Sequence, residues 1–272
     1  MSRSNTKKVV FFTPHADDIE FGSPFMCIKS LKLGYDVTEV LMTNCQYGTE
    51  RKEFRGERLE KIRKREMENV AKIYKKHTKN QLKIIYAGFI DGHLPLNQKA
   101  LNYVINLIKE IKPDIVFAPD PVYAIDYHFD HLNTGRLVYF ALKRLNSDVM
   151  PKRIFFYYSF KSNISIRCRF KDLKIVIEAL SQHKSQVSPL KSKFLYFSRK
   201  IYQINKYFKY GGFSERFREL KMVDGKPKTD QKINTIKDSM LYSIYYKLIN
   251  YPYDWYFPTP EELGLQEKVK LL

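Results

Sequence analysis

One histidine and three carboxylates follow the apolar run Val9–Thr13 within a short segment. The segment reads Pro14-His15-Ala16-Asp17-Asp18-Ile19-Glu20-Phe21-Gly22. A turn that binds the phosphates of a nucleotide is rich in glycine, because backbone amides must reach the anion. This turn instead offers an imidazole and acids, which favours a cation.

A second cluster of the same residue types, Asp126–His131, lies later in the chain after another apolar run, Ile115–Ala118. Because ligands of an open α/β sheet bind at the carboxyl ends of its strands, we expect both clusters at that edge. His128 and His131 are three residues apart, which puts both rings on one side of a first helical turn. Asp130 is near enough to fix the tautomer of one imidazole.

Together the two clusters contain the ligands of a catalytic zinc site, which takes three nitrogen or oxygen donors from the protein and leaves a position for water. His15, Asp18 and His131 could supply these donors. Asp17 would then be a general base for the water, and His128 could stabilise an oxyanion. Two histidines and a carboxylate also bind ferrous iron, so Fe2+ or another divalent metal is an alternative to Zn2+. Each residue alone could be a helix cap or a satisfied polar group, but their joint placement at two strand ends favours a metal site.

The first half of the sequence alternates apolar runs with amphipathic segments, which is typical of βα units. We predict an α/β fold with a Rossmann-like, mostly parallel sheet flanked by helices. The predicted strands are Val9–Thr13, Val37–Thr43, Lys83–Ala87, Ile115–Ala118, Ile154–Phe160 and Ile164–Arg167. The predicted helices are Ser23–Leu33, Glu53–Lys76, Asn97–Ile111, His131–Leu145 and Lys171–Gln182. Residues 1–190 are assigned to a catalytic domain, and residues 191–272 to a C-terminal extension, a helical or irregular cap packed on it.

The composition sets limits on partners and location. Forty-eight Lys and Arg against 29 Asp and Glu give a net charge of +19, which attracts anions. The basic residues are spread along the chain without a specific nucleic-acid motif, so a solvated basic surface is the favoured interpretation. No transmembrane segment and no export signal are expected. The odd count of three cysteines predicts reduced thiols and a cytoplasmic protein.

The two clusters resemble the signature of the PIG-L/LmbE-like zinc-dependent de-N-acetylases, whose motifs read P/A-H-P-D-D and H-x-D-H. The chain has Pro14-His15-Ala16-Asp17-Asp18 and His128-Phe129-Asp130-His131. Within that family it is most similar to the archaeal diacetylchitobiose deacetylases, on the strength of three segments: Val116–Pro121, Thr134-Gly135 and His183–Gln186. The sugar deacetylases are often oligomers, so the resemblance allows a homo-oligomer.

The resemblance implies a role for each residue of the clusters. The metal ligands are His15, Asp18 and His131. Asp17 is the general base, and His128, oriented by Asp130, stabilises the oxyanion. Three further residues are expected near the sugar: Arg63, Asp91 and His183. The chain departs from the family at Ala16, where a proline is usual, and at Ser23-Pro24-Phe25, where glycines are usual, so a sugar pocket of different shape is expected.

The predicted function is therefore metal-dependent removal of an acetyl group from an N-acetylglucosamine-type sugar or glycoconjugate, which releases acetate and a free amine. Two alternatives remain at this stage. One is a metal-dependent hydrolase of another amide or ester. The other is a non-catalytic protein whose basic surface binds a glycan or another anion.

Overall fold

Strand β1 (Lys8–Thr13) occupies the middle of a seven-stranded sheet with the strand order β3-β2-β1-β4-β5-β7-β6. The computed structural model describes residues 6–49, 51–126, 128–187, 214–223 and 226–227. The other strands of this sheet are β2 (Asp36–Thr43), β3 (Lys83–Phe89), β4 (Ile115–Pro119), β5 (Arg153–Tyr157), β6 (Ile164–Arg167) and β7 (Ser214–Glu219). Strands β8 (Met222–Val223) and β9 (Lys226–Pro227) form a separate hairpin.

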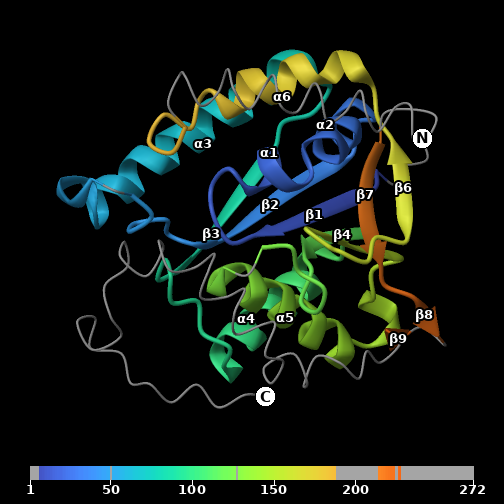
Figure 1. Cartoon of the computed structure of the whole chain (residues 1–272). Coiled ribbons are helices and arrows are strands. Elements are labelled where there is room, and N and C mark those ends of the chain that lie inside the picture. The colour runs from blue at the N-terminus through green and yellow to red at the C-terminus, as the bar shows by residue number, and fades with distance from the viewer. Residues whose placement is uncertain (1–5, 50, 127, 188–213, 224–225, 228–272) are drawn as a thin grey trace.

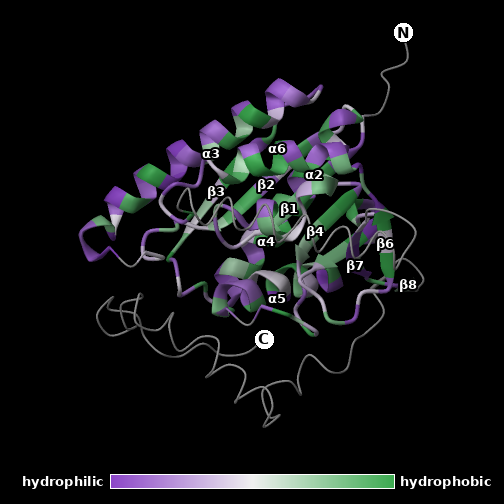
Figure 2. Cartoon of the chain, turned by 45° about the horizontal axis from the view of Figure 1, so that its top comes forward, coloured by the Kyte–Doolittle hydropathy of each residue, from purple (hydrophilic) through white to green (hydrophobic). Residues whose placement is uncertain are grey.

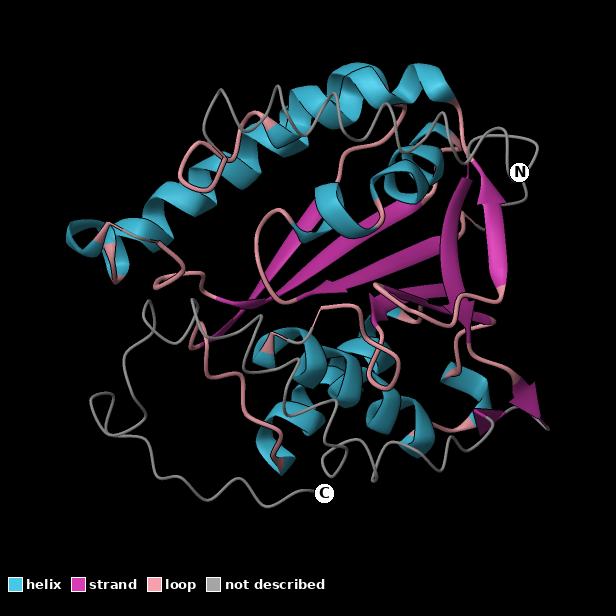
Figure 3. Ribbon diagram, viewed as in Figure 1, coloured by secondary structure: helices cyan, strands magenta, loops and turns pink. Residues whose placement is uncertain are grey.

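The sheet is mixed. Neighbouring strands from β3 to β5 pair in parallel, whereas β7 is antiparallel to both β5 and β6. Figure 3 shows the parallel strands fanning between two layers of helices. The predicted α/β fold is confirmed, and one antiparallel strand, β7, lies between β5 and β6 at one side of the sheet.

Helices cover both faces of the sheet (Figure 1). One layer contains α1 (Asp18–Gly22), α2 (Pro24–Lys32), α3 (Glu57–His77) and α6 (Leu173–Leu180). The other contains α4 (Gln98–Ile111) and α5 (Phe129–Arg144). Short 3-10 turns lie at Lys52–Phe54, Ser147–Val149 and Phe170–Asp172. No helix within the described ranges is long and apolar enough to cross a membrane.

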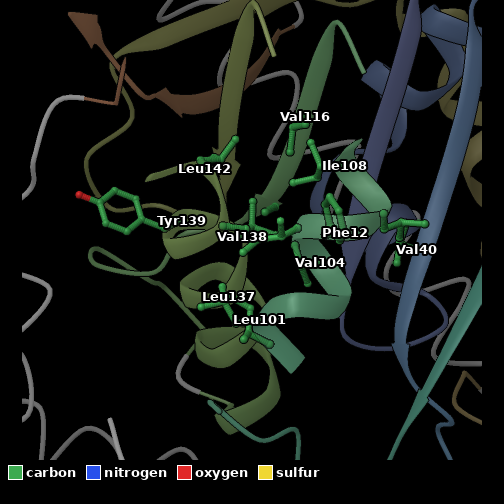
Figure 4. Close-up of a cluster of buried hydrophobic side chains, with 14 of the residues drawn as sticks. Phe12, Val40, Leu101, Val104, Ile108, Val116, Leu137, Val138, Tyr139 and Leu142 are labelled. Carbon is green, nitrogen blue, oxygen red and sulfur yellow. The ribbon is translucent and has the colours of Figure 1, made fainter. Parts of the chain in front are cut away.

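Side chains of β1 alternate between two apolar cores, because successive residues of a strand point to opposite faces. Val10 and Phe12 join the core under α4 and α5, which Figure 4 shows in close-up. Val9 and Phe11 join the core under α2, α3 and α6. Burial on both faces explains why the central strand is a continuous apolar run. In Figure 2 the strands of the sheet show much of the hydrophobic colour, whereas hydrophilic and hydrophobic patches alternate along α3.

Several observed elements differ from the predicted ones, and three of these differences concern the site and the C-terminal extension. A separate short helix, α1, starts at Asp18, ahead of the predicted helix at Ser23. Helix α5 begins at Phe129 rather than at His131, so His128 is its N-cap residue. Of the predicted C-terminal extension, only residues 214–223 and 226–227 are described. There Ser214–Glu219 is a strand of the main sheet rather than part of a helical or irregular cap. The remaining residues of the extension lie outside the described part of the chain, and the boundary at residue 190 stays a prediction.

Candidate active site

The loops after β1 and β4 bring their histidines together at the carboxyl edge of the sheet. The ring centroid of His15 lies 5.3 Å from that of His131 and 4.8 Å from that of His128. The two strands are neighbours in the sheet, with Val10 paired to Val116. Adjacent parallel strands therefore place the two sequence clusters side by side, as predicted.

His15, Asp18 and His131 offer ligand atoms that all lie within 4.8 Å of one another. The Asp18 carboxylate lies between the two rings, with Oδ2 3.6 Å from His15 Nδ1 and Oδ1 3.4 Å from His131 Nε2. Two imidazole nitrogens and a carboxylate oxygen are the donors of catalytic zinc and of ferrous sites. The three residues predicted as metal ligands are thus close enough together, and of the right chemistry, to be candidates for holding such a cation.

His15, His128 and Asp130 form a second group of similar spacing. Asp130 Oδ2 accepts a hydrogen bond from the Gly92 backbone N–H (2.7 Å), and Oδ1 accepts one from the Leu94 N–H (2.9 Å). Both carboxylate oxygens are thus already engaged by the backbone. The first group is therefore the better candidate for the metal.

Burial and neighbouring charges shift the pKa values of this group. Burial raises the pKa of Asp18 to about 7 and lowers the pKa of His131. Burial also lowers the pKa of His15, but hydrogen bonds with Asp130 and Asp91 outweigh it and raise this pKa well above its ordinary value.

Asp17 lies next to the three candidate ligands, but its carboxylate has a different partner. Its backbone has φ = 108°, a left-handed conformation that is strained for a residue with a side chain. Its Oδ1 lies 3.5 Å from the guanidinium of Arg63, which also donates to the Ala16 carbonyl. Burial raises the pKa of Asp17, and Arg63 opposes that shift. A carboxylate of raised pKa beside a metal site can accept a proton from water.

His128 is held as a neutral ring with a defined tautomer. Burial, followed by the charge of His15, lowers the pKa of His128 to about 4. Its Nδ1 accepts a hydrogen bond from the backbone N–H of Asp130 (3.2 Å), which is also the N-cap interaction of α5. Since Nδ1 is an acceptor, the proton of the neutral ring is on Nε2. His128 can therefore donate a hydrogen bond from Nε2.

Two carboxylates hold the other side of the His15 ring. Nε2 of His15 lies 3.0 Å from Asp130 Oδ2 and 3.2 Å from Asp91 Oδ1. Asp91 follows β3, and its Oδ2 accepts hydrogen bonds from the backbone N–H groups of Tyr47 and Gly48, which follow β2. A ligand histidine whose remaining N–H is held by a carboxylate has a fixed orientation. The site is thus built at the ends of β1, β2, β3 and β4.

Asp126 is a further site residue for which the sequence suggested no role. Its Oδ1 accepts a hydrogen bond from the His128 backbone N–H (2.9 Å), and its Oδ2 lies 3.6 Å from His131 Nδ1. Neighbouring histidines lower its pKa, although burial by itself raises it. The sequence does place Asp126 at the start of the Asp126–His131 cluster. Spacing alone, however, does not show which histidine its carboxylate faces.

The three residues predicted near the sugar are all buried and contact other protein groups. Arg63 contacts Asp17, and Asp91 contacts His15 and the loop after β2. His183 is fully buried, with Nε2 3.1 Å from Glu20 Oε2. Contact of these side chains with a sugar stays a prediction.

The Ser23-Pro24-Phe25 departure has a local explanation. These residues start α2, and the carboxylate of Glu215 on β7 accepts the backbone N–H groups of Phe25 and Met26, both at 2.9 Å. The first amides of this helix are therefore satisfied by the protein itself. A pocket of different shape stays an expectation.

The profile described as "GlcNAc-PI de-N-acetylase", PIG-L, matches residues 10–142. Diacetylchitobiose deacetylase of Thermococcus kodakarensis is 30% identical over 200 residues, which cover 67% of this chain and 71% of that protein. The chain belongs to the PIG-L family. As a member of this family, it is a deacetylase.

Solved structures support the fold. N,N'-diacetylchitobiose deacetylase from Pyrococcus horikoshii superposes with a TM-score of 0.67 at 26% identity, covering 79% of this chain and 84% of that one. A 4-carboxy-2-hydroxymuconate hydratase from Pseudomonas putida superposes with a TM-score of 0.63 at 12% identity, covering 83% and 99%. The same fold thus occurs in an enzyme named for different chemistry, and the argument for this chain's function depends on its site residues.

Proposed function

We propose that this protein is a zinc-dependent deacetylase that removes the acetyl group from an N-acetylglucosamine-type sugar, releasing acetate and a free amine. The observation that carries the proposal is the convergence of His15, Asp18 and His131 within 4.8 Å, with Asp17 beside them. The named activities of the Thermococcus and Pyrococcus relatives support the same substrate class.

The metal would be held by His15, Asp18 and His131. A bound divalent cation lowers the pKa of water and polarises the amide carbonyl. Zinc suits this donor set, and Fe2+ or another divalent ion is the alternative. Asp130 and Asp91 hold His15 Nε2, which leaves Nδ1, the atom that faces Asp18, free to act as the ligand.

Asp17 would act as the general base. It takes a proton from the attacking water and returns that proton to the departing amine, so that water and amide become acetate and free amine. The Arg63 guanidinium, 3.5 Å away, keeps the Asp17 carboxylate in place and favours its ionised form before attack.

His128 would stabilise the tetrahedral oxyanion. Its neutral ring carries the proton on Nε2, because Nδ1 is engaged by the Asp130 backbone N–H. A donor held before the reaction gives more stabilisation than one that must reorient during it. In this proposal Asp130 orients His128 through its backbone and His15 through its carboxylate.

Three further properties belong to the proposal. The substrate is an N-acetylated sugar or glycoconjugate, without a specific nucleic-acid partner. The enzyme works in the cytoplasm, in keeping with its free cysteines Cys27, Cys45 and Cys168. A homo-oligomer is compatible with the family resemblance.

The decisive experiment measures acetate release from a panel of N-acetyl sugars together with the metal content of the purified protein. We expect acetate and free amine in equal amounts, and activity that is lost with a chelator and restored by zinc. Zinc-restored acetate release from other amides or esters but from no N-acetyl sugar would overturn the substrate class. Full activity in protein stripped of every divalent metal would overturn the metal dependence.

A further inference from the structure

The segment that follows α6, residues 183–187, contacts the loop after β2 beside the active site. Gln186 Nε2 donates a hydrogen bond of 2.7 Å to the backbone carbonyl of Gly48 in that loop. The two residues are 138 positions apart in the chain, so the bond holds the loop from a distant part of the sequence. We call residues 183–187 the α6 tail.

The α6 tail is itself held by two other helices. Ser185 donates from its backbone N–H and from its hydroxyl to the two carboxylate oxygens of Glu66 on α3, both at 2.7 Å. His183 is buried against Glu20 of α1, with 3.1 Å between Nε2 and Oε2. The backbone N–H of Gln186 donates to the His183 carbonyl at 3.0 Å. The Gln186 amide is therefore presented by a fixed backbone, and its hydrogen bond constrains the loop.

The loop contact leads to a metal ligand in two steps. The N–H groups of Tyr47 and Gly48 donate to Asp91 Oδ2, at 2.9 Å and 3.0 Å. The other carboxylate oxygen, Asp91 Oδ1, lies 3.2 Å from His15 Nε2. Gly48 is thus held on two sides, by Gln186 at its carbonyl and by Asp91 at its N–H. The position of the Asp91 carboxylate, and of the imidazole that it faces, depends on where this loop lies.

We propose that Gln186 is a positioning residue for the metal ligand His15 and acts on it through the loop after β2 and through Asp91. This inference rests on the proposed metal site and adds to it a residue that acts from a distance. Outer hydrogen-bond partners influence metal affinity because they fix the direction in which a ligand presents its lone pair. A glutamine suits this position because its amide donates to a carbonyl without placing a further charge near Asp91.

The test measures the zinc Kd of the full chain by competition with a chelator. Gln186→Leu keeps a similar side-chain volume but cannot donate to the loop. Gln182→Leu is the matched control, because Gln182 Nε2 donates to the Glu178 carbonyl at 3.3 Å and so stays at the end of α6. We expect Gln186→Leu to raise the Kd by about three- to tenfold, less than loss of a group that faces the ligand directly. The control should stay within about twofold of wild type.

Two further measurements examine the route from Gln186 to His15. Asp91→Asn by itself should raise the zinc Kd, and adding Gln186→Leu to it should change the Kd by no more than about twofold, because the carboxylate through which Gln186 acts is already gone. Hydrogen exchange of the metal-free protein reports on the loop without zinc. The backbone amides of residues 44–49 should exchange faster in Gln186→Leu than in wild type or in Gln182→Leu.

Several outcomes would overturn this role. An unchanged Kd in Gln186→Leu would do so, and so would an equal rise in Gln182→Leu, which would indicate general loss of stability. Additive effects with Asp91→Asn would exclude the route through that carboxylate. A raised KM for the sugar with an unchanged zinc Kd would make Gln186 a substrate contact instead. If wild-type protein binds zinc but releases no acetate from N-acetyl sugars, the proposed reaction is wrong and the Kd values still decide the role of Gln186. Wild-type protein that binds no divalent cation would overturn both.

Discussion

Asp17 and Asp18 are adjacent in the chain, yet their carboxylates face different partners. Asp18 lies between His15 and His131, at 3.6 Å and 3.4 Å, whereas Asp17 lies 3.5 Å from Arg63. The left-handed backbone of Asp17, with φ = 108°, separates the two side chains. One turn can therefore present a metal ligand and a proton acceptor in consecutive positions.

The first prediction follows from this division. Asp17→Asn keeps the size of the side chain but removes its ability to take a proton, so we expect retained zinc and turnover reduced by roughly 10² to 10⁴. Asp18→Ala and His131→Ala each remove a ligand, and we expect these proteins to lose zinc on dialysis. Mass spectrometry of the metal and acetate release measure both effects. If Asp17→Asn loses zinc while Asp18→Ala keeps it, the two roles are reversed.

His128→Ala tests the oxyanion donor separately. The variant keeps all three ligands, so zinc content should match wild type, while kcat falls by about 10² to 10³, the loss for one such donor. His128→Gln can still donate a hydrogen bond and should recover part of the rate. Loss of zinc from His128→Ala would instead make His128 a ligand.

The sequence predicted most of the parallel sheet because β1, β2, β4 and β5 are buried on both faces. An apolar run such as Val9–Thr13 fits few structures other than a buried strand. The observed strand begins one residue earlier, at Lys8, and ends at the same residue. Strand β7 was missed because its sequence, Ser-Glu-Arg-Phe-Arg-Glu, is mostly polar. Two of its charged side chains, Glu215 and Arg218, are buried against partners far away in sequence, and Arg218 pairs with Asp120 (2.6 Å). The local sequence pattern of a strand does not show which distant residues its charged side chains will pair with.

The same limit applies to the site. Strand ends and residue types were enough to bring His15, Asp18 and His131 together. The side-chain direction of Asp126 depends on how α5 is capped. The burial of His183 depends on how α6 packs on α1, where His183 contacts Glu20. These are consequences of tertiary packing, and no spacing in the sequence predicts them.

Gly135 should be essential for the approach of α5 to the end of β4. A Cβ at this position would overlap the Pro119 carbonyl oxygen and lie 3.0 Å from Pro121 N, both of them backbone atoms that cannot rotate away. We expect Gly135→Ala to lower the free energy of unfolding by about 1 to 3 kcal/mol or more. Gly48→Ala, whose Cβ would make an ordinary 3.6 Å contact with Asp91 Oδ2, is the control. Equal stability of both variants in urea denaturation would contradict this account.

Asp114 should make stability dependent on pH. The hydrogen bond from Lys152 (2.8 Å) and that from the Lys8 backbone N–H (3.0 Å) lower the pKa of Asp114 in the folded state. Its contribution is therefore complete above the unfolded pKa of about 3.9 and is lost as the pH falls through the folded pKa. Asp114→Asn should cost about 1 kcal/mol at pH 7 and progressively less as the pH falls below about 4. A difference in urea denaturation that does not shrink with acid would exclude this cause.

Asp130→Asn should weaken metal binding although Asp130 is not one of the proposed ligands. The carboxylate accepts hydrogen bonds from the Gly92 and Leu94 backbone and lies 3.0 Å from His15 Nε2, so it fixes the ring that presents Nδ1 toward Asp18. An amide has one acceptor oxygen and no charge, and it cannot make all three contacts. We expect the zinc Kd, measured by competition with a chelator, to rise by about 10- to 100-fold. Asp114→Asn makes the same chemical change away from the site and should leave the Kd unchanged; if Asp130→Asn behaves in the same way, the orientation of His15 does not depend on this carboxylate.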